Sequence, residues 1–203
     1  MATKQEVKLT AEQKLIGKIT NFFENNRLGV IIAAAIVIVA ILAAVITVNV
    51  INTKNENAQI VAYNLEAKFY ELIASDDPDW NSFEAEAKAL IKNGSYPSVK
   101  AAYVLGLAYY EQQEYADALS AFENAYNLNT KIYLAPIALV NAAASAEANG
   151  DVQKALSLYN NVYDNYPESG VASKALFNVA RIYYQQGNVQ LAKSTFEQVA
   201  SYY

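Results

Sequence analysis

The sequence predicts an all-α protein in which a single amino-terminal transmembrane helix is followed by an α–α superhelical solenoid. Two observations lead to this fold class. Residues 28–48 form one stretch without a charged side chain, and similar residues recur every 37 positions in the second half of the chain. The recurring positions are Ala118, Ala155 and Ala192, then Phe122, Tyr159 and Phe196, and finally Gly150 and Gly187. A fixed period of this length indicates stacked repeats, each built from a pair of helices.

The composition narrows the classes of function. The chain has 203 residues, a formal net charge of −5, and neither cysteine nor histidine. Disulfides, thiol nucleophiles, imidazole bases and the usual zinc ligands are therefore missing. We expect a protein that is not an enzyme and that uses no cofactor and no metal. The first 27 residues carry a net charge of +2 and the rest −7. Because Lys and Arg supply most nucleic-acid affinity, an acidic domain is a poor nucleic-acid binder.

The uncharged stretch, residues 28–48, is long enough to cross the hydrocarbon core of a bilayer as a helix. A cleaved signal peptide is the alternative, but its apolar core is usually about 7–15 residues and ends at a small-residue cleavage site. Neither condition fits. Lys14, Lys18 and Arg27 precede the stretch and only Lys54 follows closely, which predicts a cytoplasmic amino terminus. We therefore expect a single-pass protein of the bacterial inner membrane with its carboxy-terminal domain in the periplasm.

The first 27 residues are predicted to be a cytoplasmic tail that contains a short amphipathic helix. Its apolar residues recur at helical spacing, at Leu9, Leu15, Ile16, Ile19, Phe22 and Phe23. Thr10 and Gln13 resemble a capping box at its start. The helix either docks a cytoplasmic partner or steadies the anchor along the membrane. We favour the second role, because basic amphipathic flanks are common beside anchors.

The repeats are expected over residues 60–203, after a linker at residues 49–59. Three clear units occupy residues 99–130, 136–167 and 173–203, and a degenerate first unit occupies 60–97. In that first unit we predict helices at 62–75 and 78–92. Asp77 is its predicted amino-terminal cap with Pro78 at the first helical position, and Gly94 is the predicted helix stop.

The units resemble the tetratricopeptide repeat. In the first clear unit, Leu105 and Gly106 occupy the close-packing positions of the first helix, while Ala118, Phe122 and Ala125 form the small-large-small series of the second. Gly106 and Ala118 let two helix backbones approach, and Phe122 fills the space between neighbouring units.

The later units depart from this pattern in two places. The second has Ala142 and Ala143 where the Leu-Gly pair is expected. The third stops where its closing proline would come next, so either a capping helix is missing or the carboxyl terminus is incomplete. Because terminal units usually need a polar cap, the last helix is a candidate to rest on a partner.

The layout of a short tail, one span and a small acidic repeat domain resembles the ancillary subunit of the Sec translocon. The repeat spacing and the segment from Tyr166 to Ser169 are also similar to envelope proteins of the Tol-Pal and outer-membrane assembly type. These resemblances imply an adaptor that links emerging chains at the Sec channel to periplasmic chaperones. The alternative is a structural scaffold subunit of an envelope machine, such as a flagellar motor collar or a Tol-type complex. A hydrolase that uses carboxylates alone is a third and weaker hypothesis.

By the same resemblance, the first helix of each unit lines a partner-binding groove. Its residues are Lys100, Tyr103, Leu107, Tyr110, Ile137, Val140, Lys174, Phe177, Arg181 and Tyr184, accompanied by Glu111, Ala144 and Glu147. Such a groove suits an extended segment or a helix of another protein, with no nucleic acid and no small-molecule substrate.

Aromatic and acidic residues each allow two interpretations. We predict that Tyr109, Phe122, Tyr159, Tyr183 and Phe196 pack inside the stack, whereas Tyr103, Tyr110, Phe177 and Tyr184 either pack or bind a partner. Asp76, Asp77 and Asp79 could bind a cation, but they lack the spacing of a calcium loop and lie at a predicted helix start. We therefore interpret them as capping residues.

Overall fold

The structure is a computed structural model that describes residues 10–201, apart from the side chain at position 55. Within these residues the chain is helical and contains no strand, which confirms the predicted all-α class. The helices are α1 (Ala11–Asn25), α2 (Arg27–Ile73), α3 (Trp80–Leu90), α4 (Tyr96–Glu111), α5 (Tyr115–Leu128), α6 (Leu134–Ala148), α7 (Val152–Asn165), α8 (Ala172–Gln185) and α9 (Val189–Ser201). The chain divides into two compact units, residues 1–54 and 55–203.

The first unit contains α1 and the first part of α2. The predicted capping box is confirmed, because Thr10 and Gln13 each accept a hydrogen bond from the other's backbone amide, at 3.3 Å and 2.9 Å. The helix ends at Asn26, whose backbone amide and side-chain amide both donate to the carbonyl of Phe22 at 3.0 Å. The position of Leu9 lies outside the described residues.

Helix α2 contains the predicted membrane span. In the part of the chain that the structure describes, α2 is the one helix that is long and apolar enough to cross a membrane, by length and composition. Most of the large apolar side chains of residues 28–48 are exposed, and none of the most apolar stretch of α2 is buried inside the protein. Residues 49–59, predicted as a linker, are helical and belong to α2.

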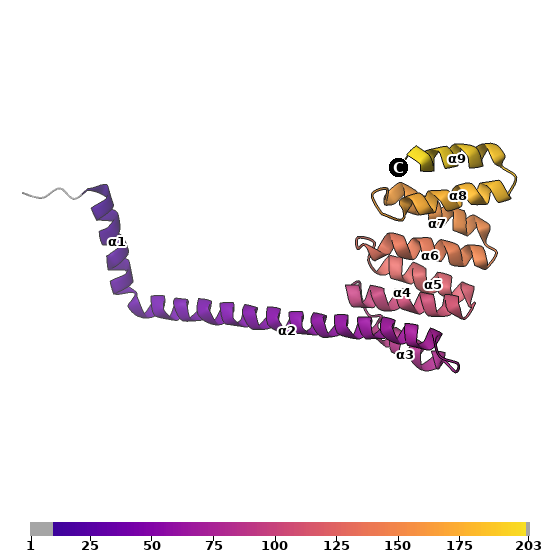
Figure 1. Cartoon of the computed structure of the whole chain (residues 1–203). Coiled ribbons are helices and arrows are strands. Elements are labelled where there is room, and N and C mark those ends of the chain that lie inside the picture. The colour runs from indigo at the N-terminus through magenta and orange to yellow at the C-terminus, as the bar shows by residue number, and fades with distance from the viewer. Residues whose placement is uncertain (1–9, 202–203) are drawn as a thin grey trace, which may run out of the picture. The chain divides into compact units, whose positions relative to one another are not determined.

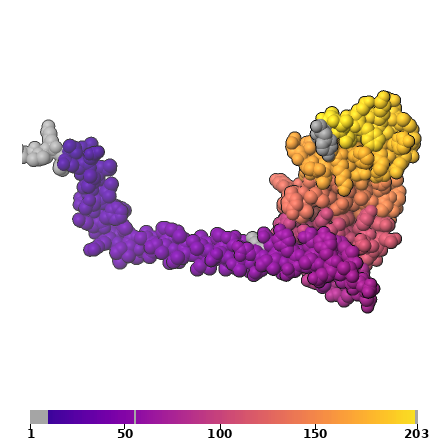
Figure 2. Space-filling view, in the orientation of Figure 1, coloured from indigo at the N-terminus to yellow at the C-terminus, as the bar shows by residue number. Residues whose placement is uncertain are grey.

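The second unit contains the end of α2 followed by α3 to α9. Figure 1 shows these helices layered in chain order, and the same sequence of layers runs from magenta to yellow in Figure 2. Each helix from α3 onward packs on the next, and α4 also contacts α6. The pairs α4 with α5, α6 with α7, and α8 with α9 correspond to the three clear repeats. We call α4, α6 and α8 the first helices of the repeats.

Small residues allow the two helices of each pair to pack closely. Ala118, Ala155 and Ala192 are all buried at the recurring position. Gly106 faces Phe122, and a Cβ atom added at Gly106 would lie 2.6 Å from Cδ1 of that ring. The predicted packing roles of Gly106, Ala118 and Phe122 are therefore confirmed, since only a glycine leaves the ring its space.

In each of the three clear repeats, the two helices are connected by the same type of turn. Gly150 and Gly187 have positive φ angles of 85° and 79°, the left-handed conformation that favours glycine. The equivalent residue of the preceding repeat is Gln113, with a φ angle of 63°. In each turn the residue at this position and the next donate to carbonyls of the last helical turn, which is the Schellman arrangement.

The degenerate first repeat corrects two predictions. Helix α3 begins at Trp80 rather than at Pro78, and its cap is Asp79, whose side chain accepts a hydrogen bond from the amide of Ser82 at 3.0 Å. The helix ends at Leu90, before Gly94. Gly94 instead passes close to the carbonyl of Leu128, where no Cβ atom would fit. Its small size thus serves contact between repeats and not helix termination.

Candidate functional site

Three polar pairs join α2 to α4, α4 to α6 and α6 to α8. Nζ of Lys100 on α4 lies 2.5 Å from a carboxylate oxygen of Glu66 on α2. Nδ2 of Asn141 on α6 donates to the hydroxyl of Tyr103 on α4 at 2.9 Å. Arg181 on α8 pairs with the carboxylate of Glu147 on α6. Each pair spans 34 or 38 residues, about one repeat, so these side chains fasten neighbouring repeats to one another.

Five of the predicted groove residues face the inside of the stack. Lys100 is 7% exposed and its ammonium lies 5.8 Å from the centre of the Tyr63 ring. Val140 is 4% exposed and belongs to the core, while Leu107 and Ile137 are half-buried against it. These residues stabilise the repeats, and Lys100 and Val140 offer little surface to a partner.

Tyr103 is the fifth, and it packs rather than projects. Its ring lies 5.5 Å from that of Phe122, tilted by 56°. Burial raises the pKa of the Tyr103 phenol above its usual range, because the phenolate would lose hydration, although the hydrogen bond from Asn141 partly opposes this shift. At this position the structure shows the ring packed against Phe122 and the hydroxyl bonded to Asn141.

Other predicted residues are exposed and concentrate on the last repeat. Phe177 and Tyr184 on α8 are 47% and 64% exposed and lie seven residues apart, on the same face of the helix. Lys174 is exposed one turn before Phe177. Tyr110 on α4 is 39% exposed, but its ring contacts Tyr115 at 5.2 Å between centres.

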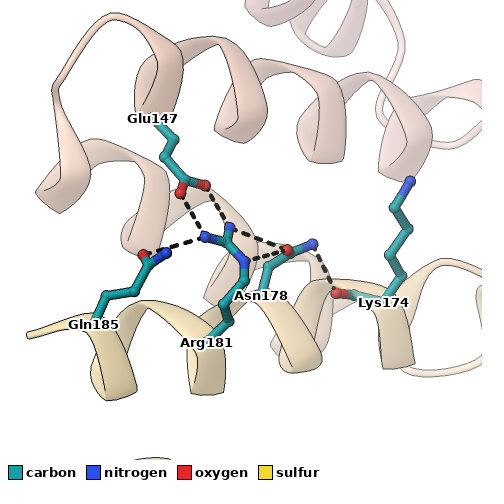
Figure 3. A network of polar contacts seen from close by, with 5 residues as sticks. All are labelled: Glu147, Lys174, Asn178, Arg181 and Gln185. Atoms are coloured by element: carbon teal, nitrogen blue, oxygen red, sulfur yellow. Dashed lines mark hydrogen bonds and ion pairs between the residues drawn. The ribbon is translucent and has the colours of Figure 1, made fainter.

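Arg181 lies between these aromatic residues and is fixed by a network of polar contacts (Figure 3). Its two terminal nitrogens donate to the two carboxylate oxygens of Glu147 at 2.7 Å and 2.6 Å. It also donates to the side-chain oxygens of Asn178 and Gln185 at 3.2 Å. The hydrogen bonds to Glu147 raise the pKa of Arg181 further. The guanidinium is therefore held in one orientation while remaining partly accessible.

Helix α9 adds apolar side chains beside this face. The ring of Phe196 lies 5.4 Å from that of Phe177 in an edge-to-face arrangement. Val189 and Leu191 at the start of α9 are 60% and 52% exposed. A hollow of about 530 Å³ is lined by Tyr184, Val189, Ala192, Lys193, Phe196, Glu197 and Ala200. We call Phe177, Tyr184, Val189 and Phe196, with the hollow beside them, the α8–α9 surface.

The remaining residues singled out in the sequence differ in how deeply they are buried. Phe122, Tyr159 and Tyr109 are buried, as expected of packing residues, and Tyr183 is half-buried. Phe196 was also expected to pack, but it is only half-buried and lines the hollow of the α8–α9 surface. Glu111 is exposed, and Ala144 is half-buried.

A second hollow, of about 710 Å³, lies where the loops before α6 and α8 meet. It is lined by residues that include Tyr133, Pro136, Ile137, Pro167 and Val171. Tyr166 borders it and is fixed by a hydrogen bond from its hydroxyl to the carbonyl of Thr130 at 2.9 Å. Apart from Ile137, the residues that line this hollow were not predicted as binding residues.

The described residues contain no group of three or more potential metal-binding side chains. No buried side-chain nitrogen or oxygen among them lacks a hydrogen-bond partner. The acidic residue Asp79 caps a helix, and Asp76 and Asp77 are exposed in the loop before it.

Three residues of the polar contacts described above were not predicted from the sequence. Glu66, Asn141 and Asn178 were not predicted, although the first two form contacts between repeats. Glu66 and Lys100 are 34 residues apart, as are Glu147 and Arg181. A search for opposite charges at about one repeat length would have found both pairs.

Sequence profiles described as tetratricopeptide repeat match residues 84–133, 103–170 and 174–203. No curated protein matches the chain. Among solved structures, the chain is similar to the TPR-like repeats of a kinesin light chain from Podosopora anserina, with 19% identity over 60% of this chain and a TM-score of 0.50. A variant of that protein matches with 17% identity over 60% of this chain and a TM-score of 0.49. The chain covers 63% and 66% of those two chains, and at such identity the likeness shows the fold alone.

Proposed function

Because the chain carries tetratricopeptide repeats over residues 84–170 and 174–203, we propose that it is a membrane-anchored module that binds other proteins through the α8–α9 surface. Its most specific form is an adaptor at the Sec translocon, linking emerging chains to periplasmic chaperones. This form rests on the resemblance in layout to the translocon's ancillary subunit, and the binding module itself rests on the repeats.

The exposed aromatic pair of α8 is the observation that carries the binding role. Phe177 and Tyr184 leave about half or more of their area in solvent, and Arg181 is held between them. Aromatic residues and Arg are the types enriched where proteins meet, because they bury much area with few rotatable bonds. An adjacent apolar hollow is the kind of feature that receives the side chain or helix of a partner.

The anchor is assigned to residues 28–48 of α2. Their length and lack of charge suit a bilayer, and the positive residues before them favour a cytoplasmic amino terminus. On this assignment the protein is a single-pass protein of the bacterial inner membrane, and its repeats lie in the periplasm. Partners would then be proteins of that compartment or of the membrane itself.

The cysteine-free chain allows a direct test of this topology. Ser157→Cys on α7 and Thr20→Cys on α1 each place one thiol at an exposed position. A membrane-impermeant thiol reagent should label the Ser157→Cys variant in cells with a permeabilised outer membrane and the Thr20→Cys variant only after lysis. Labelling in the reverse order would place the repeats in the cytoplasm.

A scaffold subunit of an envelope machine is the second candidate. The observation in its favour is the apolar character of the α8–α9 surface, since permanent interfaces are more hydrophobic than transient ones. The two candidates differ in partner exchange, because an adaptor releases its clients and a scaffold does not.

The test is purification of the tagged full-length protein from native membranes in mild detergent, with mass spectrometry of the proteins that accompany it. The wild type is compared with Phe177→Ala/Tyr184→Ala and with Tyr70→Ala, which removes an exposed aromatic on α2. Sec channel subunits with a periplasmic chaperone, lost in the double variant and retained in Tyr70→Ala, are the expected result. Stoichiometric recovery of another envelope complex would favour the scaffold. Unchanged capture by the double variant would move the interface away from α8 and α9.

A further inference from the structure

Helix α1 presents an apolar face that is left exposed within its own unit, residues 1–54. None of its residues is buried, and five large apolar side chains are between 49% and 61% exposed. They are Leu15, Ile16, Ile19, Phe22 and Phe23. Their spacing of three, four and seven residues gathers them along one side of the helix. An isolated helix with such a face is unstable in water, so the face implies an apolar or interfacial environment.

The polar side of α1 is basic along one flank. Lys14 and Lys18 are one turn apart and therefore lie side by side, at the border of the apolar face. Arg27 follows at the start of α2. Of the two acidic residues, Glu12 is in the first turn, where a carboxylate complements the helix dipole, and Glu24 lies away from the lysines. A cationic flank beside an apolar face matches the border between acyl chains and anionic headgroups.

The apolar face of α1 continues into the span. Asn26 alone separates the two helices, and its hydrogen bonds to the carbonyl of Phe22 close α1 at that point. A hollow of about 750 Å³ follows, lined by Phe22, Phe23, Asn26, Gly29, Val30, Ala33, Ala34, Val37 and Ile38. All of these side chains but Asn26 are apolar or absent. Acyl chains fill such a space without loss of hydrogen bonds, whereas water does not.

We propose that α1 lies in the headgroup region of an anionic bilayer, with its apolar side chains among the acyl chains and Lys14 and Lys18 beside lipid phosphates. The proposal rests on the proposed membrane span. An anionic lipid surface is preferred over a protein partner because one surface explains the exposed face, the basic flank and the continuity with the span. The helix then fixes the depth of the anchor at the cytoplasmic side.

The experiment uses the full-length protein in lipid nanodiscs and single nitroxide labels, which the absence of cysteine makes specific. Labels are placed by Ile19→Cys on the apolar face, Asn21→Cys on the polar face and Ile38→Cys in the span. Electron paramagnetic resonance measures collisions of each label with oxygen, which partitions into lipid, and with a water-soluble nickel chelate. Discs of phosphatidylglycerol mixed with phosphatidylcholine are compared with discs of phosphatidylcholine alone.

In the anionic discs, the ratio of oxygen to nickel collisions at Ile19→Cys should exceed that at Asn21→Cys several-fold. The Ile19→Cys ratio should fall in neutral discs and in Lys14→Gln/Lys18→Gln. Equal ratios at the two positions, with the Ile38→Cys label still in lipid, would overturn the placement of α1 while leaving the span intact. Shielding of Ile19→Cys from both reagents would indicate a protein contact and would also overturn it. A water-exposed Ile38→Cys would overturn the span and with it the proposed anchor.

Discussion

Arg181 of α8 donates two hydrogen bonds to the carboxylate of Glu147 of α6, at 2.7 Å and 2.6 Å, across the boundary between two repeats. The planar guanidinium matches the carboxylate at both oxygens, which makes this a stronger contact than a single ion pair. Because Arg181 lies between Phe177 and Tyr184 on α8, the same contact that joins the repeats also orients the candidate binding surface.

Glu147→Gln should lower the free energy of unfolding by about 1 kcal/mol, because Arg181 keeps its partial burial and loses its charged partner. Chemical denaturation followed by circular dichroism measures this change. Glu197→Gln is the matched control: the Glu197 carboxylate lies 4.0 Å from the Lys193 ammonium and its side chain is 68% exposed, so the loss of stability should be within the error of the measurement. An equal effect of the two substitutions would show that the bidentate contact adds nothing.

Gly106→Ala should destabilise the repeat domain by about 1–3 kcal/mol, as overpacking of a core does. The added methyl group would lie 2.6 Å from the ring of Phe122, which is buried and has little room to move. Gly170→Ala provides the control, since a Cβ atom there meets nothing within 4 Å. Thermal melting of both variants tests the prediction, and a Gly106→Ala variant as stable as the wild type would contradict it.

The positions that recur every 37 residues show which part of the fold can be predicted from the sequence. Ala118, Ala155 and Ala192 are all buried, because the helix pairs repeat with the same geometry at each 37-residue step. Local rules also predicted the capping box at Thr10, whose partners are three residues apart. Patterns of this kind depend on short distances in the chain and on regular packing, both of which are visible without coordinates.

The candidate surface was harder to predict, because exposure depends on which side of each helix its neighbours cover. Lys100 is a charged residue on a first helix and was expected in the groove, yet the degenerate repeat brings Glu66 against it. Phe177 on α8 occupies the same repeat position as Tyr103 on α4, 74 residues earlier. Phe177 is exposed, whereas Tyr103 packs against Phe122. The same repeat position therefore has a different role in each layer of the stack.

Asp79→Ala should cost about 0.5–2 kcal/mol of stability, the usual value of a lost amino-terminal cap. The Asp79 side chain accepts a hydrogen bond from the amide of Ser82, and alanine would leave that amide without its partner. Asp77→Ala tests the competing assignment, since Asp77 lies in the loop before the helix and should matter little. Urea denaturation of the two variants decides between them: a larger loss in Asp77→Ala would restore Asp77 as the cap.

Stability should fall at high pH because of the buried phenol of Tyr159. Burial raises the pKa of Tyr159 to about 12, and the negative charge of Glu147 adds to this shift. The unfolded chain ionises near the ordinary tyrosine pKa of about 10. The contribution of neutral Tyr159 is therefore complete below pH about 10 and is lost as the pH rises toward 12.

Tyr159→Phe removes this ionisation, so its stability should decline less steeply than that of the wild type over the same pH range. Denaturation midpoints measured at intervals from neutral pH to about pH 12 give the two slopes. Tyr184→Phe, at the surface, controls for the general effect of alkali on the fold. Identical slopes for wild type and Tyr159→Phe would show that Tyr159 ionises equally easily in the folded and unfolded chain.

Gln113→Gly should stabilise the protein by about 1 kcal/mol, because a side chain in the left-handed region costs roughly that much and glycine does not. Gln113 has a φ angle of 63° in the same turn where the next two repeats have Gly150 and Gly187. The amide of Gln113 donates to the carbonyl of Tyr110 at 3.0 Å, a backbone contact that the substitution leaves in place. Gln112→Gly is the matched control: this neighbour has helical angles of −75° and −1°, so glycine there should be neutral or destabilising. Thermal melting of both variants compares them, and a loss of stability in Gln113→Gly would mean that its side chain contributes more than its backbone conformation costs.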